Sequence, residues 1–340
     1  MQKHAVSGRN FSEMDPELSP VYPENALVMA PLSGFTDLAY RRAARKGGCR
    51  YAFTEMVDAA SLAYANGHGE VLLKRGGEED FLATQLVGAD PELLKRACDK
   101  LNNYDFSLLD FNLGCPVPKV VKKGAGAALG KNISGALECF AAIAGNSKFT
   151  LTAKLRILDE VDPEPTLELC AGLVELGAKA LTIHGRTREH FYTGEVKFSI
   201  IRAVREAFPQ IPVIANGGVN SREAYETMRK ETGCSRVMLA QGIMGNPWLF
   251  RELAGEGLPP TLDEWKALVA FHVKEMIALY GENSAMRQAR KIVHDYLKGR
   301  GFAASFRAEA SMLNTFDELR QLLDKVEIGA VSGTIRKILI

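Results

Sequence analysis

The chain has 340 residues, of which 46% are hydrophobic and 24% are charged, and its 42 Lys and Arg against 41 Asp and Glu leave a net charge of +1. This is the balance of a globular protein with a sizeable core, and it excludes a surface that is uniformly positive. A local basic patch could still bind nucleic acid. No run of about eighteen apolar residues is present, so we expect no membrane-spanning helix.

Residues 1–20 are polar, have no apolar segment typical of a secretory signal and are expected to be loosely ordered. The six cysteines form no CxxC pair and match no zinc spacing, so we expect free thiols and no bound metal. Thiols scattered over predicted helices and strands are typical of a reducing compartment, which makes the cytoplasm the expected location.

Eight short apolar segments alternate with helical patterns along the chain. They are 26–30, 51–53, 83–87, 108–112, 151–155, 180–184, 212–216 and 237–240. Helices are predicted between them, for example over 91–101, 166–176 and 221–232, with Asp90 and Ser221 as N-cap candidates and Gly177 and Gly233 as C-cap signals. This repetition predicts an α/β fold, a (β/α)8 TIM barrel of parallel strands. An open doubly wound sheet has the same local units, so the barrel rests on the count of eight.

After Pro259-Pro260 the pattern changes to long amphipathic stretches, and we expect helices near 263–279, 285–298, 303–313 and 316–326. We therefore predict a barrel over 21–258 and a small all-helical C-terminal domain over 261–340.

Polar residues recur where the predicted strands end, which in a barrel is the catalytic face. They are Gln85, Asn112 with Cys115 just after it, Lys154, Arg156, His184, Asn216 and Gln241. One such residue alone is usually structural. Several of them converging on one rim would be costly to bury without a ligand.

The predicted loops after strands seven and eight indicate which ligand this is. Asn216-Gly217-Gly218 and Gln241-Gly242 supply glycines that let backbone N–H groups approach a phosphate. Lys154 would stabilise the negative charge of a reduced flavin, and Met29-Ala30-Pro31-Leu32-Ser33 offers a rigid, partly apolar edge. Together these features favour FMN.

A competing motif, Gly124-Ala-Gly126-Ala-Ala-Leu-Gly130, looks like a dinucleotide fingerprint with one extra residue. It begins more than ten residues beyond the fourth predicted strand instead of directly after it, which argues against a Rossmann site. We expect a loop at the edge of the substrate or flavin.

In this order, the motifs together resemble the dihydrouridine synthase family over most of the chain. The segments are Met29-Ala-Pro-Leu-Ser-Gly-Phe-Thr-Asp37, Gln85-Leu-Val-Gly88, Asp110-Phe-Asn-Leu-Gly-Cys-Pro116, Lys154-Leu-Arg156, His184-Gly-Arg-Thr-Arg188, Asn216-Gly-Gly218 and Met244-Gly-Asn-Pro-Trp-Leu-Phe250. The helix end Tyr296-Leu-Lys-Gly299 looks more like the bacterial B-type branch.

The resemblance implies an FMN-bound barrel with a C-terminal helical domain that reduces uridine in tRNA with electrons from NADPH. It implies that Cys115 is the general acid, and that FMN contacts fall on Pro31, Gln85, Lys154, His184, Asn216 and Gly218. The sequence departs from the family after the eighth predicted strand, where Ala240-Gln241 stands in place of the usual Gly-Arg. Gln241 lacks the guanidinium charge that helps to hold the phosphate.

Substrate residues are predicted on two surfaces. In the pocket, Asn112 is expected to hydrogen-bond the uracil edge, and Arg156 or Arg186 to stabilise charge on its C4 oxygen. Outside it, one predicted helix face carries Arg287, Lys291, His294 and Lys298, with Arg290 and Arg300 beside it. An ordinary solvated face gives the same pattern, but Lys119, Lys122 and Lys123 near Cys115 favour RNA.

Two alternatives stay open at this point. One is an FMN-dependent barrel oxidoreductase acting on a free pyrimidine such as dihydroorotate, which gives no reason for a basic helical domain. The other is a non-catalytic RNA-binding module, which leaves Cys115 and the polar strand ends unexplained. A monomer is the default expectation.

Overall fold

The computed structural model describes residues 21–64 and 70–326, so the expectation for residues 1–20 lies outside the described residues. The described strands form one parallel sheet in the order β1-β8-β7-β6-β5-β4-β3-β2. The strands are β1 (Leu27–Met29), β2 (Ala52–Asp58), β3 (Leu82–Val87), β4 (Leu108–Leu113), β5 (Leu151–Arg156), β6 (Leu181–His184), β7 (Val213–Asn216) and β8 (Arg236–Leu239). Each predicted strand is found, and the parallel pairing is confirmed.

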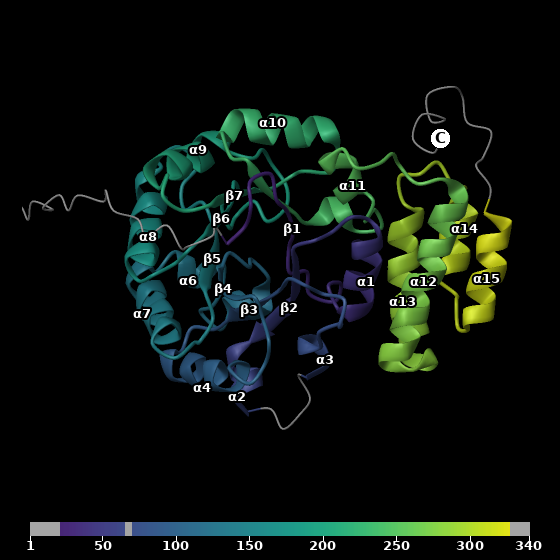
Figure 1. The fold of residues 1–340 in the computed structure, drawn as a ribbon, viewed down its shortest axis with the longest axis horizontal. Helices are drawn as coiled ribbons and strands as arrows, with labels where there is room; N and C mark the ends of the chain where they lie inside the picture. The colour runs from purple at the N-terminus through teal and green to yellow at the C-terminus, as the bar shows by residue number, and fades with distance from the viewer. Residues whose placement is uncertain (1–20, 65–69, 327–340) are drawn as a thin grey trace, which may run out of the picture.

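The sheet closes on itself, as Figure 1 shows. β1 pairs with β8 in the register Leu27 to Val237 and Met29 to Leu239. On its other side β1 meets the start of β2, where the Met29 N–H donates to the Tyr51 carbonyl at 2.8 Å. The predicted (β/α)8 TIM barrel is therefore confirmed over an open doubly wound sheet.

Helices follow the strands around the outside of the barrel. They are α1 (Leu38–Lys46), α2 (Ala59–Tyr64), α3 (Glu70–Leu73), α4 (Pro91–Leu101), α5 (Pro118–Val121), α6 (Ala127–Gly130), α7 (Ile133–Ala144), α8 (Glu164–Glu175), α9 (Phe198–Ala207), α10 (Arg222–Thr232), the 3-10 turn η1 (Gln241–Ile243) and α11 (Leu249–Ala254). The predicted N-caps Asp90 and Ser221 begin α4 and α10, and both side chains accept backbone N–H groups. The predicted C-cap Gly233 ends α10 in the left-handed conformation. In the described ranges, no helix is long and apolar enough to cross a membrane.

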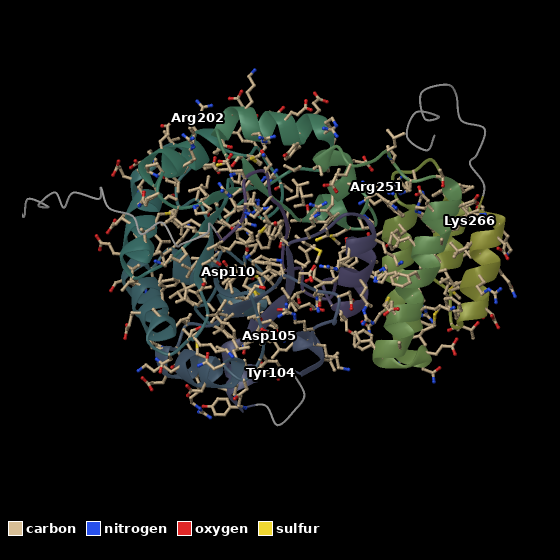
Figure 2. All side chains as sticks on the ribbon, viewed as in Figure 1. Tyr104, Asp105, Asp110, Arg202, Arg251 and Lys266 are labelled. Carbon is tan, nitrogen blue, oxygen red and sulfur yellow. The ribbon has the colours of Figure 1, made fainter. Side chains whose placement is uncertain are left out.

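Side chains alternate along each strand between the barrel interior and the helices. On β5, Ala153 and Leu155 belong to the large core under the helices, whereas Lys154 points inward. A separate apolar cluster fills one end of the interior, with Tyr22, Val28, Phe53, Leu108, Ile214 and Met238 among its members. Figure 2 places Asp110 inside the ring of strands and Arg202 on the outer helices. The cluster closes that end of the barrel, which leaves the C-terminal ends of the strands for a site.

Four further helices stand beside the barrel (Figure 1): α12 (Leu262–Tyr280), α13 (Glu282–Leu297), α14 (Ala304–Ala310) and α15 (Phe316–Lys325). They match the four predicted helices. α12 lies against α1, where Arg42 pairs with Glu275 at 2.6 Å and the Tyr280 hydroxyl donates to Asp37 at 2.9 Å. Trp265 on α12 is fully buried among the C-terminal helices, with its ring 4.9 Å from that of Phe302. The C-terminal helices thus contact the barrel at α1, the first helix of the barrel.

Candidate active site

A cavity of about 860 Å³ opens at the C-terminal ends of the strands. It brings together residues from opposite ends of the sequence. Its walls include Cys115 and all the residues predicted to contact a cofactor: Pro31, Leu32, Ser33, Gln85, Lys154, His184, Asn216, Gly217, Gly218, Ala240 and Gln241. Of the predicted substrate residues, it includes Asn112, Arg156, Arg186 and Lys291, but not Arg287, Arg290, Lys298 or Arg300.

A buried hydrogen-bond chain crosses the interior side of the cavity. Asp110 accepts from Thr152 Oγ1 at 2.6 Å and from Gln85 Nε2 at 2.7 Å, and Gln85 Oε1 accepts from Asn112 Nδ2 at 2.7 Å. Burial raises the pKa of Asp110 to about 6. Asp110 sets the orientation of the Gln85 amide, and Gln85 sets that of the Asn112 amide. The orientation of Asn112 therefore depends on the Asp110 carboxylate.

Asn112 passes this orientation to the loop that carries Cys115. Its Oδ1 accepts the backbone N–H groups of Gly114 at 3.0 Å and Cys115 at 2.9 Å, while Nδ2 also lies 3.2 Å from the Met56 sulfur. We expected Asn112 to bind the uracil edge. Its oxygen and both amide protons have protein partners, so its visible role is to position Cys115.

Arg156 holds the same loop from the neighbouring strand. Its Nε donates to the Gly114 carbonyl at 2.8 Å and its Nη1 to the Thr187 carbonyl at 3.0 Å. The side chain is almost wholly buried, and burial lowers its pKa. Arg156 therefore ties the loop after β4 to the loop after β6 and keeps a positive charge at the cavity wall.

Cys115 differs from the other five cysteines, which are all buried, because its side chain is only partly covered. Burial raises the pKa of its thiol, and nearby Lys154 and Arg156 oppose that shift only partly. The thiol is thus protonated at neutral pH. Gly126 packs closely on the backbone of Cys115: a Cβ on Gly126 would come within 2.7 Å of the Cys115 carbonyl oxygen. The glycine motif that resembled a fingerprint instead gives room to the Cys115 loop.

Two ionisable side chains, Lys154 and His184, stand on the next strands of the barrel, β5 and β6. Lys154 Nζ donates to Asn216 Oδ1 at 3.0 Å, and burial lowers its pKa to about 8. Burial, together with the charges of Lys154, Arg156 and Arg186, lowers the pKa of His184 far below neutrality. His184 is therefore a neutral hydrogen-bonding group, and Lys154 is a cation at the edge of its titration range.

The glycine turns after β7 and β8 form a cradle of backbone. Gly217 and Gly218 have φ of +129° and +72°, a region that favours glycine. A Cβ on Gly242 would lie 2.2 Å from the Val219 carbonyl oxygen, so the two loops touch backbone to backbone. Such a cradle suits a phosphate, and the nearby Lys154 suits an anionic flavin ring. The residues present fit FMN.

Tyr192 is a wall residue that the sequence reasoning missed. It is half exposed, its ring lies 5.6 Å from the Arg156 guanidinium, and it lines the cavity with Cys115. The available signal was an aromatic pair, Phe191-Tyr192, in an otherwise polar loop. Exposed aromatic rings of this kind are able to stack on a nucleobase.

The predicted basic face on α13 is exposed as expected, with Arg287, Lys291, His294 and Lys298 on the solvent side. Lys291 also lies over the Phe35 ring at 4.9 Å and lines the cavity. Buried on the other side of the helix are Ala289, Ile292, Val293, Tyr296 and Leu297. We call the four exposed residues the α13 basic stripe.

Arg300 and Arg290 depart from the expectation that they extend this stripe. Arg300 is only 8% exposed, and its Nη2 donates to Asn246 Oδ1 at 2.8 Å while its guanidinium covers the Trp248 ring. Arg290 donates to the Leu313 carbonyl at 2.8 Å and to Asn314 at 2.7 Å. Arg300 joins the helices to the barrel, and Arg290 joins α13 to the segment after α14.

A closed parallel barrel with polar side chains gathered at the C-terminal ends of its strands is the architecture of TIM-barrel enzymes. The dihydrouridine synthase family model matches residues 28–330, and the chain belongs to that family.

Several curated relatives share its length. The chain is 31% identical to tRNA-dihydrouridine synthase B of Pseudomonas aeruginosa over 88% of this chain and 92% of the relative. It is 30% identical to that of Shewanella oneidensis, over 91% and 97%. It is 31% identical to that of Vibrio cholerae, over 89% and 95%.

Proposed function

We propose that this protein is a tRNA-dihydrouridine synthase that uses FMN and NADPH to reduce the C5=C6 bond of uridine in tRNA to 5,6-dihydrouridine. The observation that carries the proposal is the cavity itself, which combines a protonated Cys115 thiol, a buried Lys154 cation and the glycine cradle. Family membership and the names of its relatives support the same reaction.

The chemistry divides between the cofactor and the chain. The cavity would hold FMN, whose chemistry when bound and reduced is to provide a hydride for C6 of uracil. A proton must then be added at C5, and Cys115 is the group placed to donate it, because burial keeps its thiol protonated. Asn112 and Arg156 hold the loop that aims this thiol, one through the Cys115 and Gly114 N–H groups and one through the Gly114 carbonyl.

The cofactor would be held by groups on three adjacent strands, β5, β6 and β7, and by the loop after β7. Lys154, His184 and Asn216 lie on adjacent strands, with Gly217 and Gly218 after them. The β5–β6 and β6–β7 registers pair Arg156 with His184 and His184 with Asn216. A flat ring there would meet neutral His184 and cationic Lys154. Reduction adds negative charge to the flavin, and the Lys154 ammonium would stabilise it.

tRNA would be held by the C-terminal helices. A uridine in folded tRNA is stacked and must leave the stack to enter the cavity, so the surrounding RNA needs a surface of its own. We propose that α12–α15 form this RNA-binding domain and that the α13 basic stripe contacts phosphates. Lys291 belongs to both the stripe and the cavity wall, which makes the two surfaces continuous.

The test begins with the purified protein and its bound flavin. We expect yellow protein that releases FMN on denaturation, oxidises NADPH and forms dihydrouridine in unmodified tRNA, detected by mass mapping. Free uridine, uracil and orotate serve as substrate controls. Reduction of a free pyrimidine without activity on tRNA would favour the small-molecule oxidoreductase, and protein without flavin would contradict both readings.

A further inference from the structure

The loop after β8 carries Gln241 where the resemblance to the dihydrouridine synthase family implies an arginine beside the phosphate. Gln241 occupies that position, lines the cavity and is exposed to solvent. An amide can donate a hydrogen bond to a phosphate oxygen, but it cannot neutralise the charge of a phosphate dianion. A second cation is therefore needed if FMN is to be preferred over an uncharged flavin.

Arg186 stands beside the cradle from a different strand. Its Nη2 lies 3.6 Å from the point that a Cβ on Gly218 would occupy, and the Val196 side chain lies 3.5 Å from the same point. Gly218 has a φ of +72°, so the turn is one that a side chain would strain. The guanidinium and the glycine turn are thus close neighbours, with Val196 beside them.

The Arg186 side chain is held in place by its other nitrogens. Nε donates to the Gly194 carbonyl at 2.9 Å, and Nη1 lies 3.4 Å from His184 Nε2. In the described part of the chain, no carboxylate pairs with Arg186, and burial lowers the pKa of its guanidinium. Nη2 is accordingly the nitrogen that faces the cradle, and the cation is one that an anion would stabilise.

Four other cations of the cavity have partners elsewhere, and a fifth, Lys119, lies on α5 in the segment that follows Cys115. Lys154 bonds Asn216, Arg156 bonds the Gly114 and Thr187 carbonyls, and Lys123 pairs with Asp58 at 2.8 Å. Lys291 lies over the Phe35 ring at 4.9 Å. Lys154 reaches Asn216, just before the Gly217-Gly218 turn, whereas the Arg186 guanidinium lies beside Gly218 itself.

We propose that Arg186 supplies the positive charge for the FMN phosphate in this protein, in place of the arginine that Gln241 replaces. This inference rests on the proposed function, since it takes FMN to be the cofactor. It moves Arg186 from the substrate to the cofactor, and it leaves Arg156 as the guanidinium nearer Cys115.

Riboflavin lacks the phosphate and so isolates this contact. Apoprotein would be titrated with FMN and with riboflavin at neutral pH, following quenching of flavin fluorescence. Removing one charged donor to a phosphate should weaken FMN binding by about tenfold to a hundredfold. We therefore expect Arg186→Gln to lose that much affinity for FMN while riboflavin affinity stays the same. Arg186→Lys, which keeps the charge, should lose less.

Two further variants sharpen the result. Arg188→Gln removes a guanidinium from the same loop but from outside the cavity wall, so it should change neither affinity. Gln241→Arg should restore the FMN preference in the Arg186→Gln background, because it returns a guanidinium to the loop after β8. Rescue of this kind would not follow if Arg186→Gln had merely unfolded the loop.

Equal loss of FMN and riboflavin affinity in Arg186→Gln, or no loss for either, would overturn the inference. The proposed function would be overturned separately, by wild-type protein that binds neither flavin. If the wild-type protein and Arg186→Gln prefer FMN to riboflavin equally, the role of Arg186 fails and the proposed function stands.

Discussion

Asn112 Oδ1 accepts the backbone N–H of Cys115 at 2.9 Å, so a residue near the C-terminal end of β4 also sets the direction of the proposed acid. The same side chain donates from Nδ2 to Gln85. A cavity residue predicted to bind substrate also positions another residue. The distinction leads to separate predictions for the two positions.

Cys115→Ala should retain bound flavin and NADPH oxidation but lose uridine reduction. A general acid contributes about 10²–10⁴-fold to a rate, and the loss should fall in that range. Flavin reduction by NADPH and single-turnover formation of dihydrouridine would be measured on the same sample. Cys139→Ala, a buried thiol on α7, is the matched control. Product formation at the wild-type rate in Cys115→Ala would remove Cys115 from the reaction.

Asn112→Ala should slow dihydrouridine formation although Asn112 need not touch uridine. The substitution leaves the buried Gly114 and Cys115 N–H groups without their acceptor, at a cost of about 1–3 kcal/mol per unsatisfied group. The Cys115 loop should then shift. We expect a lower single-turnover rate, a lower melting temperature and nearly unchanged KM for tRNA. A raised KM with an unchanged rate would instead support a direct contact between Asn112 and uracil.

FMN affinity of the apoprotein should fall as the pH rises through the pKa of Lys154, which burial lowers to about 8. Below that pKa Lys154 is charged and attracts the anionic cofactor, and above it the neutral amine does not. The fall should approach about tenfold per pH unit where protonation is coupled to binding. Lys154→Met should bind FMN weakly with no such dependence. A wild-type affinity that is flat through this range would contradict the role of the charge.

The same Lys154 shift has a consequence for stability. A base whose folded pKa is lowered opposes folding while it is charged, so its penalty is largest below about pH 8 and disappears as the pH rises toward the unfolded value. In apoprotein, Lys154→Met should therefore raise the free energy of unfolding most at neutral pH. Chemical denaturation at neutral and at alkaline pH would detect the difference, and a destabilised variant at neutral pH would refute it.

tRNA binding should depend steeply on salt if the α13 basic stripe contacts phosphates. Arg287→Gln and Lys298→Gln should each weaken binding and lower the slope of log K against log salt by about 1. Lys230→Gln, which removes an exposed cation from α10 on the barrel, should leave the slope unchanged. Binding measured by fluorescence anisotropy over a range of salt would decide. Equal slopes in all four proteins would show that the stripe is an ordinary solvated face.

The strands and the polar residues at their C-terminal ends follow from short-range patterns, so the sequence was sufficient to predict them. Alternation along β5 and β6 puts Lys154, Arg156 and His184 on the inner face. Closure of the barrel then brings these side chains to one cavity. What the sequence could not supply is which atom each polar group bonds. Whether Asn112 meets uracil or Cys115, and whether Arg300 meets water or Asn246, depends on loops that approach from distant parts of the chain.

Spacing also does not reveal burial at the end of a helix. Arg300 continues the basic run of α13 in the sequence, but the chain turns after Leu297 and brings it over Trp248. Tyr192 was missed for the converse reason, because its loop has no periodic pattern that would mark one face as the cavity wall.

The contact between Tyr280 and Asp37 joins the end of α12 to the residue that begins α1, a few positions after the Pro31 loop at the cavity wall. The Arg42–Glu275 ion pair lies further along the same seam, so two side-chain contacts join α12 to the segment of α1. These contacts would hold the α13 basic stripe at a set distance from Cys115. Which nucleotide arrives at the thiol would be decided by how a tRNA lies across that span, and a variant that loosened the seam would be expected to blur the choice of position.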